Sequence, residues 1–565
     1  MAEPGFQDQS VKLSRQELLA AFCALSVALF TCFMDQNGVG LALPDIGRDL
    51  HAEATVSWAG TSALIANTVF QVLYGRLSDI FGRKVILISA LILLSVSDLL
   101  CGFAVNSTML YVFRGLSGVA SGGITSLTMV TVSDIVSLQE RGKYQGILGS
   151  MVGLGNMVGP SVAAAFVQKS TWRGLFWVIC PLAAMTSVAC MKLLPGKPGK
   201  VSLKQGMQVV DWWGLLTGSA AVILILVPIS GGGTYFQWES PMVISMLVLG
   251  GICAVAFVIV ENRVARLPMM PGSVYKDPVV GVLLAQNVLS GFNYYSTLYY
   301  VPLFLQNARQ LSPVVSASIV IAFPLFQSVF SVLSGQYNSR IGHYGELLWI
   351  GFFLWTLGAA LNCIFTRDTP ITAMVVILAC QGAGVGFVFQ PILVALQAHC
   401  TKANRAVITS NRNFLRCTGG AIGLVASAAV LQARLKNNLP TGFEYLALSS
   451  YSAPDLQGTT AAQRKGVLDA YASASRSVFI LNVPFMAICL ILCLFVKDRG
   501  LVRAEEVKDE VKHAGFEADL TSDSRETVAE DADKKDVMQS VEEKSETKTA
   551  RTRRLCERVF RRLRG

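Results

Sequence analysis

The chain has 565 residues, of which 52% are hydrophobic and 15% are charged. A soluble domain carries roughly 25% charged residues, so this composition excludes an ordinary soluble protein and indicates a polytopic membrane protein. The formal net charge of +10 belongs to loops and tails beside a bilayer, and we therefore expect no nucleic-acid partner.

The apolar segments predict an all-α protein that crosses the membrane about fourteen times. A span needs about 20 mostly apolar residues. By that measure the expected spans are 17–43, 55–77, 85–105, 108–134, 144–168, 172–194, 212–231, 241–262, 279–306, 313–336, 345–366, 371–397, 407–432 and 476–496.

Basic residues are distributed unevenly between the short loops on the two sides of the membrane. One side holds most of them, including Arg83, Lys84 and Arg141, whereas the other holds few, such as Arg48 and Arg173. Short cytoplasmic loops are rich in Lys and Arg, so both termini are expected in the cytoplasm. The predicted location is the plasma membrane, with the vacuolar membrane as the alternative.

Residues 497–565 have a different composition. Asp, Glu, Lys, Ser and Thr dominate without apolar periodicity, which predicts a disordered cytoplasmic tail. At its end Leu555, Val559 and Leu563 recur every four residues among arginines. That pattern favours either a short helix on anionic lipids or a solvated basic tail.

Glycine spacings indicate an internal repeat. Gly75-x6-Gly82 after the second span returns as Gly335-x6-Gly342 after the tenth, and Gly155 and Gly159 return as Gly419 and Gly423. This predicts two six-helix halves with a two-helix insertion and a binding site between them near the midplane. The expected segments are the tail 1–16, the N-terminal half 17–194, the linker 195–262 with two extra spans, and the C-terminal half 263–496, which includes an outer loop at about 433–475.

Four motifs resemble those of the major facilitator superfamily, and of its fourteen-span drug:proton antiporters in fungi. They are Met34-Asp35-Gln36 with Ala42-Leu43-Pro44, Gly75 to Lys84, Leu110-x3-Arg114-Gly115-x2-Gly118, and Gly146-x8-Gly155-x3-Gly159-Pro160. The resemblance implies that the second motif (Gly75, Asp79, Gly82, Arg83 and Lys84) forms a gating latch. The alternative is that its basic residues only set topology. The resemblance also implies that Gly146, Gly155, Gly159 and Pro160 mark an antiporter helix and hence export.

Asp35 and Arg114 are the strongest candidates for proton coupling. At 1.5 Å per residue, Asp35 lies about 12 Å and Arg114 about 9 Å from the outer end of its helix, so the two charges share one depth. Ionisable groups inside spans often mark proton relays, although a fixed ion pair is the structural alternative. Asp98 stands alone in its span, and Arg416 lies deep enough to need a partner that the sequence does not reveal.

Polar and aromatic residues within spans are candidates for the substrate cavity. These are Asn67, Gln71, Asn293, Tyr295, Tyr299 and Gln390. Aromatic rings with a few amides suit flat amphipathic molecules, but ordinary hydrogen bonding between helices is equally common.

The predicted function is proton-coupled export of drugs, toxins or secondary metabolites by alternating access. No P-loop, metal-binding or nucleophile pattern occurs, so we expect no enzyme, no cofactor and an ion gradient as the energy source. The first alternative is a transporter of basic amino acids or ammonium. The second is a non-transporting sensor or scaffold with the tail as its partner-binding element.

Overall fold

The computed structural model describes residues 13–52, 55–56, 58–195, 210–231, 239–265, 268–401, 404–443, 446, 459–498 and 500. Within these residues the regular elements are helices. The N-terminal group is α1 (Arg15–Asp49), α2 (Trp58–Phe81), α3 (Arg83–Gly102), α4 (Ser107–Ile135), α5 (Leu138–Lys169) and α6 (Arg173–Leu193). Two further helices, α8 (Trp212–Gly231) and α9 (Pro241–Arg263), follow. The C-terminal group is η1 (Gly272–Lys276), α10 (Pro278–Asn307), α11 (Pro313–Val320), α12 (Ala322–Ile341), α13 (Gly345–Asn362), α14 (Ile371–Ala398), α15 (Arg405–Asn438), α16 (Ala461–Leu492) and η4 (Cys493–Phe495).

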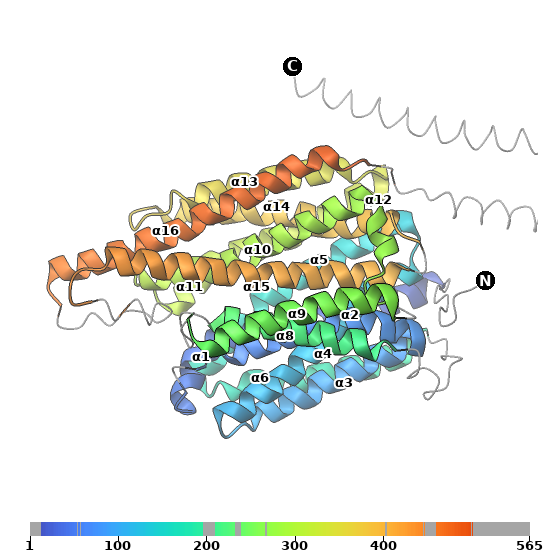
Figure 1. Cartoon of the computed structure of the whole chain (residues 1–565), viewed down its shortest axis with the longest axis horizontal. Coiled ribbons are helices and arrows are strands. Elements are labelled where there is room, and N and C mark those ends of the chain that lie inside the picture. The colour runs from blue at the N-terminus through green and yellow to red at the C-terminus, as the bar shows by residue number, and fades with distance from the viewer. Residues whose placement is uncertain are drawn as a thin grey trace, which may run out of the picture.

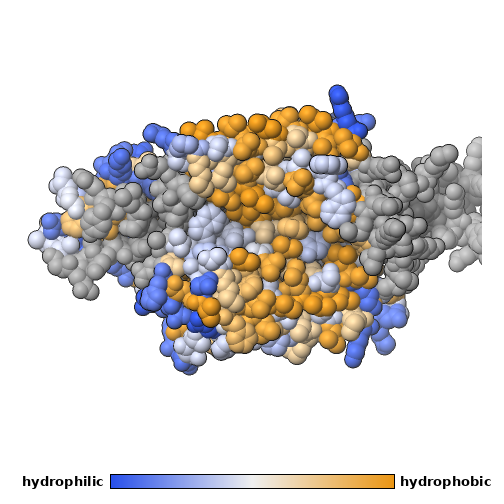
Figure 2. Space-filling view, turned by 60° about the horizontal axis from the view of Figure 1, so that its bottom comes forward, coloured by the Kyte–Doolittle hydropathy of each residue, from blue (hydrophilic) through white to orange (hydrophobic). Residues whose placement is uncertain are grey.

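The helices form a bundle with an apolar belt, as expected for a multi-pass membrane protein. Among the described residues, 12 helices are long and apolar enough to cross a membrane. Two long helices, α2 with 24 residues and α10 with 30, are not among those 12, yet they pack along α4 and α15 respectively. Orange, apolar side chains cover the middle of the molecule in Figure 2, and hydrophilic ones lie toward its two ends.

The bundle consists of two halves with an inserted pair of helices, and the predicted fold class is confirmed. Helices α1–α6 pack on one another, as do α10–α16, and the halves meet where α5 packs on α12 and α2 packs on α15. Of the inserted pair, α8 packs on α2 and α15, beside that second contact, and α9 packs on α8 (Figure 1).

Local sequence signals fix several helix ends. Ser14 and Glu17 form a capping box at the start of α1, and the Asn106 side chain caps α4 by accepting from the Met109 backbone. Such caps satisfy backbone N–H groups that the first helical turn leaves free. Between α2 and α3 the chain reverses at Gly82, whose φ of 95° suits glycine far better than other residues.

Glycines of α5 form two close seams. A Cβ at Gly146 would lie 2.5 Å from the Ser331 carbonyl oxygen of α12. On another side of α5, a Cβ at Gly155 would lie 2.7 Å from the Phe33 Cβ, and one at Gly159 would lie 2.4 Å from the Met34 carbonyl oxygen of α1. These approaches leave no room for a side chain, as in other membrane helices joined through small residues. Pro160 lies inside α5, which continues through it.

The repeated glycines of the two halves pack against corresponding helices. Gly75 of α2 approaches Ser410 of α15, while Gly335 of α12 approaches Gly142 and Gly146 of α5. Likewise, Gly419 and Gly423 pack against α10 as Gly155 and Gly159 pack against α1. The sequence repeat therefore corresponds to a repeat of helix contacts.

The structure adds detail to two predicted segments. Helix extends into both ends of the predicted outer loop at about 433–475, because α15 continues to Asn438 and α16 begins at Ala461 with a Thr460–Gln463 capping box. The tenth predicted span corresponds to α11 and α12, which meet at Ile321 and together form one candidate span, Val314–Ile341. The predicted tail helix around Leu555 to Leu563 lies outside the described residues.

We predict that Gly146→Ala destabilises the protein, because the added methyl group meets backbone atoms of α12. Overpacking of this kind costs about 1–3 kcal/mol, and alanine's better helix propensity offsets only about 1 kcal/mol of it. Thermal unfolding of the purified protein in detergent measures the effect. Gly115→Ala is the control because a Cβ there meets nothing within 4 Å, and equal stability of the two variants would contradict the close seam.

Candidate functional site

A cluster of three charged side chains is buried inside the N-terminal half. Asp35 Oδ1 lies 2.6 Å from Arg114 Nη1, and Asp98 Oδ1 lies 3.8 Å from the same nitrogen. Both aspartates are 0% exposed and Arg114 is 1% exposed. The cluster therefore joins α1, α3 and α4 through charges that water does not reach in this conformation.

The charges in this cluster do not balance if both carboxyl groups are ionised. Arg114 supplies one positive charge, and its Nε is occupied by the Ala59 carbonyl oxygen at 3.3 Å. Asp35 Oδ2 and both Asp98 oxygens have no hydrogen-bond partner among the described residues. The described residues thus place two carboxyl groups beside one cation. Sequence reasoning noted Asp98 only as an isolated charge in an apolar span and missed its place beside Arg114.

A second network of charges closes the end of the bundle where α2 turns into α3. Arg83 lies 2.6 Å from Asp79 Oδ1 and 3.0 Å from Asp134 Oδ2. Asp134 Oδ1 in turn lies 3.0 Å from Arg405 Nη1 on α15. The predicted latch residues Asp79 and Arg83 thus connect to the other half through Asp134, while Lys84 donates to the Leu194 carbonyl oxygen at the end of α6.

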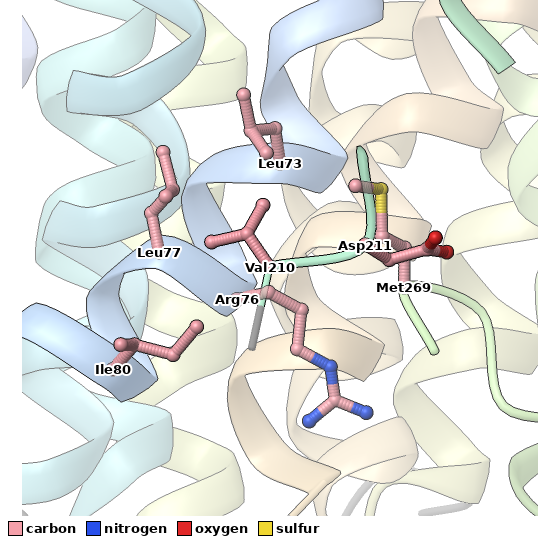
Figure 3. A pocket seen from close by; sticks show the side chains of 7 residues that line it. All are labelled: Leu73, Arg76, Leu77, Ile80, Val210, Asp211 and Met269. Atoms are coloured by element: carbon pink, nitrogen blue, oxygen red, sulfur yellow. The ribbon is translucent and has the colours of Figure 1, made fainter. Parts of the chain in front are cut away.

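The same end of α2 contacts the segments that flank the inserted helices. Leu73, Leu77 and Ile80 of α2 face Val210 and Met269 across a small pocket, which Arg76 and Asp211 also line (Figure 3). Arg76 Nε donates to the Pro268 carbonyl oxygen at 2.7 Å. Glu261 at the end of α9 accepts from the backbone N–H groups of Met269 and Met270. These contacts attach the chain entering the C-terminal half to α2.

Two arginines on α15 lie one helical turn apart at the contact between the halves. Arg412 is 0% and Arg416 5% exposed, and their guanidinium carbons lie 5.8 and 5.1 Å from the centroid of the Phe389 ring. Arg412 Nη2 donates to the Phe389 carbonyl oxygen at 2.6 Å, and Arg412 Nη1 lies 3.9 Å from Met129 Sδ of α4. Both side chains thus lie among aromatic, thioether and neutral polar groups.

Three of the predicted cavity residues come together beside Arg416. Gln71 Nε2 donates to Asn67 Oδ1 on α2 and lies 3.7 Å from Cys417 Sγ. The Tyr295 hydroxyl lies 3.8 Å from the same sulfur. Residues of α2, α10 and α15 therefore meet at this point between the halves.

The other predicted cavity residues lie apart from that group. Asn293 accepts hydrogen bonds from Trp355 and Gln381 within the C-terminal half, and Tyr299 is 41% exposed. Gln390 on α14 is buried, and its Oε1 has no hydrogen-bond partner among the described residues. A Cβ at Gly149 of α5 would lie 2.7 Å from Gln390 Nε2, so Gln390 faces the contact between α5 and α14.

A row of hydrogen bonds crosses from the N-terminal to the C-terminal half. Asn37 of α1 donates to Asn156 Oδ1 of α5 at 2.6 Å, and Asn156 donates to the Tyr294 hydroxyl of α10 at 2.8 Å. The Tyr294 hydroxyl then donates to Gln327 of α12 at 3.2 Å. Because the Tyr294 ring also packs against Phe389, with the ring centroids 5.1 Å apart, this row leads from α1 toward the buried arginines.

The described residues form a helical membrane bundle of two related halves, with buried charges and polar groups between them, which is the architecture expected of a membrane transporter. The Major Facilitator Superfamily model matches residues 25–424. The chain belongs to this superfamily, whose members are transporters and not enzymes.

Similar proteins include fungal transporters. The chain is 45% identical to Citrate exporter 1 of Yarrowia lipolytica, over 95% of this chain and 80% of that protein. It is 39% identical to the MFS-type transporter clz4 of Cochliobolus lunatus, over 90% and 91% of the two chains. Among solved structures, the proton:xylose symporter XylE superimposes with a TM-score of 0.54 at 12% identity, over 88% of this chain and 99% of that one, which shows the shared fold.

We predict that Asp134→Asn destabilises the protein by about 3–5 kcal/mol, the usual cost of removing one partner from a buried ion pair. The substitution leaves Arg83 and Arg405 without their shared carboxylate. Thermal unfolding in detergent measures the effect. Asp469→Asn is the control, because its ion pair with Arg367 is exposed and such pairs contribute about 0–1 kcal/mol. An equally small effect of both substitutions would contradict a role of Asp134 in holding the halves together.

Proposed function

We propose that this chain is a proton-coupled exporter that moves small organic compounds by alternating access. The observation that carries the proposal is the buried group of Asp35, Asp98 and Arg114. With one proton the group is neutral and can be enclosed, whereas without it the group has an excess negative charge that favours contact with water. Binding and release of one proton can thereby be linked to which side of the protein is open.

The network around Asp134 supports a gate at the end of the bundle where α2 turns into α3. Its ion pairs hold α15 to α3 and α4 in the closed arrangement. Rocking of the halves would have to break the contact between Asp134 and Arg405, and separation of such interface ion pairs is a common part of conformational switching. We place this end, with both termini, in the cytoplasm of a plasma-membrane protein, on the distribution of basic residues.

Organic acids are the first candidate cargo. The similarity to Citrate exporter 1 supports this choice, and so do the two buried arginines between the halves. For a membrane that is negative inside, each negative charge leaving the cell gains ~2.3 kcal/mol per 100 mV. A proton entering in exchange gains the same amount, plus ~1.4 kcal/mol per pH unit. Potential and proton gradient therefore both drive export of an anion.

Larger amphipathic compounds are the second candidate cargo. Tyr294, Tyr295 and Phe389 form an aromatic group beside the polar residues, and such rings bind flat apolar molecules. Basic amino acids and ammonium fit less well, because Arg412 and Arg416 would repel a cation.

Transport in inside-out vesicles tests the proposal. With an acidic lumen, protons leaving the vesicle should drive labelled citrate, or another member of a panel of organic acids and amphipathic drugs, into the lumen. If no compound of the panel moves with the gradient in vesicles that contain the wild-type protein, proton-coupled export is wrong.

We further predict that Asp35→Asn reduces proton-driven accumulation at least tenfold while exchange of labelled for unlabelled substrate continues, because the variant lacks the proton site but retains the translocation path. The matched control is Asp45→Asn on the same helix, where the carboxylate pairs with Arg48 near the surface. Accumulation against a gradient by Asp35→Asn would rule out Asp35 as the coupling site.

A further inference from the structure

Arg412 and Arg416 carry two buried charges that the described part of the chain does not neutralise. Neither guanidinium forms an ion pair with a carboxylate of a described residue, and the Nε atoms of both lack a hydrogen-bond acceptor. The hydrogen-bonding oxygens that Arg412 meets belong to neutral groups, the Phe389 carbonyl and the Asn413 amide.

Such an arrangement is unfavourable as a purely structural feature. A buried cation without an anion loses its hydration and gains no compensating charge, and two cations one turn apart repel each other. Two other buried arginines differ, because Arg114 faces two aspartates and Arg405 faces Asp134. The absence of a counterion for Arg412 and Arg416 among the described residues is therefore best explained by an anion that binds and dissociates reversibly.

We propose that Arg412 and Arg416 bind a small organic anion with at least two carboxylate groups. The inference rests on the proposed function, since this anion is the transported cargo. Side chains four residues apart on a helix lie on one face, with about 5–6 Å between Cβ atoms. Each guanidinium is a planar fork that matches one carboxylate, so two of them suit a molecule with two carboxylates.

The position of the pair fits a transport site. Arg412 and Arg416 lie seven and eleven residues after the start of α15, which at 1.5 Å per residue is about 10 and 16 Å along the helix. Half of a bilayer core is about 15 Å, so the pair lies near the midplane. Contact of Arg412 with Met129 of α4 places it where the two halves separate during alternating access.

This geometry predicts an order of ligands. Citrate and succinate can pair with both guanidinium groups at once. Acetate leaves one arginine unpaired, and inorganic phosphate is too compact to engage both forks separately. Binding should therefore be strong for the di- and tricarboxylates and at least tenfold weaker for acetate and phosphate.

Ligand binding to the purified full-length protein, in detergent and without any gradient, tests the proposal. Thermal unfolding and calorimetric titration are measured with citrate, succinate, acetate and phosphate for the wild type, Arg412→Gln, Arg416→Gln and Arg434→Gln. Arg434 is the matched control, since it is exposed on the same helix. Each buried substitution should weaken citrate binding about 10–100-fold, the effect of losing a charged hydrogen-bonded contact, and Arg434→Gln should leave it unchanged.

A second readout separates binding from structure. Without ligand, Arg412→Gln and Arg416→Gln should unfold at the same temperature as the wild type or higher, because each removes an uncompensated buried charge. A lower unfolding temperature with unchanged citrate affinity would show a structural role and overturn the proposal. Arg412→Lys and Arg416→Lys keep the charge but lose the planar guanidinium group with its paired donors. They should weaken citrate binding by a smaller factor, and they carry the test if a glutamine variant does not fold.

The remaining outcomes distinguish this inference from the proposed function. Equal binding of acetate, phosphate and citrate, or citrate binding by both glutamine variants within threefold of the wild type, would overturn the dicarboxylate site. Arginine-dependent citrate binding without proton-driven transport would support the site and contradict proton-coupled export. Proton-driven transport of another compound, unaffected by either arginine substitution, would support export and overturn the site.

Discussion

The ion cluster of Asp35, Asp98 and Arg114 imposes the central constraint on this molecule. Each of its charged groups is enclosed by apolar helices, where a charge is tolerated only if it is paired. One arginine can compensate one carboxylate, and in the proposed mechanism a proton compensates the second carboxyl group. A change of protonation can therefore favour one conformation over the other, provided that the affinity for the proton differs between them.

The remaining polar contacts show how this constraint extends to the other half. The row of Asn37, Asn156 and Tyr294 links α1, which carries Asp35, to α10 beside the buried arginines. On α15, Arg405 lies in the network at one end of the bundle, and Arg412 and Arg416 lie further along the same helix. A rigid movement of α15 would thus change the proposed gate and the proposed cargo site together.

Some of these features followed directly from the sequence. Counting residues from the helix ends placed Asp35 and Arg114 at one depth, and the structure brings them to 2.6 Å. Regular glycine spacing indicated close packing between helices, and Gly146 and Gly155 occupy such contacts. These predictions needed only helix geometry, which is local and periodic.

Contacts between distant segments could not be predicted in this way. Asp98 and the bond from Asp134 to Arg405 depend on how helices are arranged around one another, and no periodic pattern in a single segment specifies that arrangement. The extended ends of α15 and α16 were missed for another reason. Hydropathy detects the apolar part of a helix but not its polar continuation, although Thr460 and Gln463 gave a capping-box signal for the true start of α16.

Simultaneous measurement of substrate and proton movement in proteoliposomes tests the central claim most directly. The purified protein is reconstituted with a pH-sensitive dye inside, and an outward citrate gradient is imposed with no initial pH difference and with the membrane potential clamped at zero. The coupling mechanism predicts that citrate leaving the vesicles draws protons in and acidifies the lumen, and that Asp35→Asn shows citrate movement without acidification. Citrate efflux from wild-type vesicles without any proton movement would contradict it.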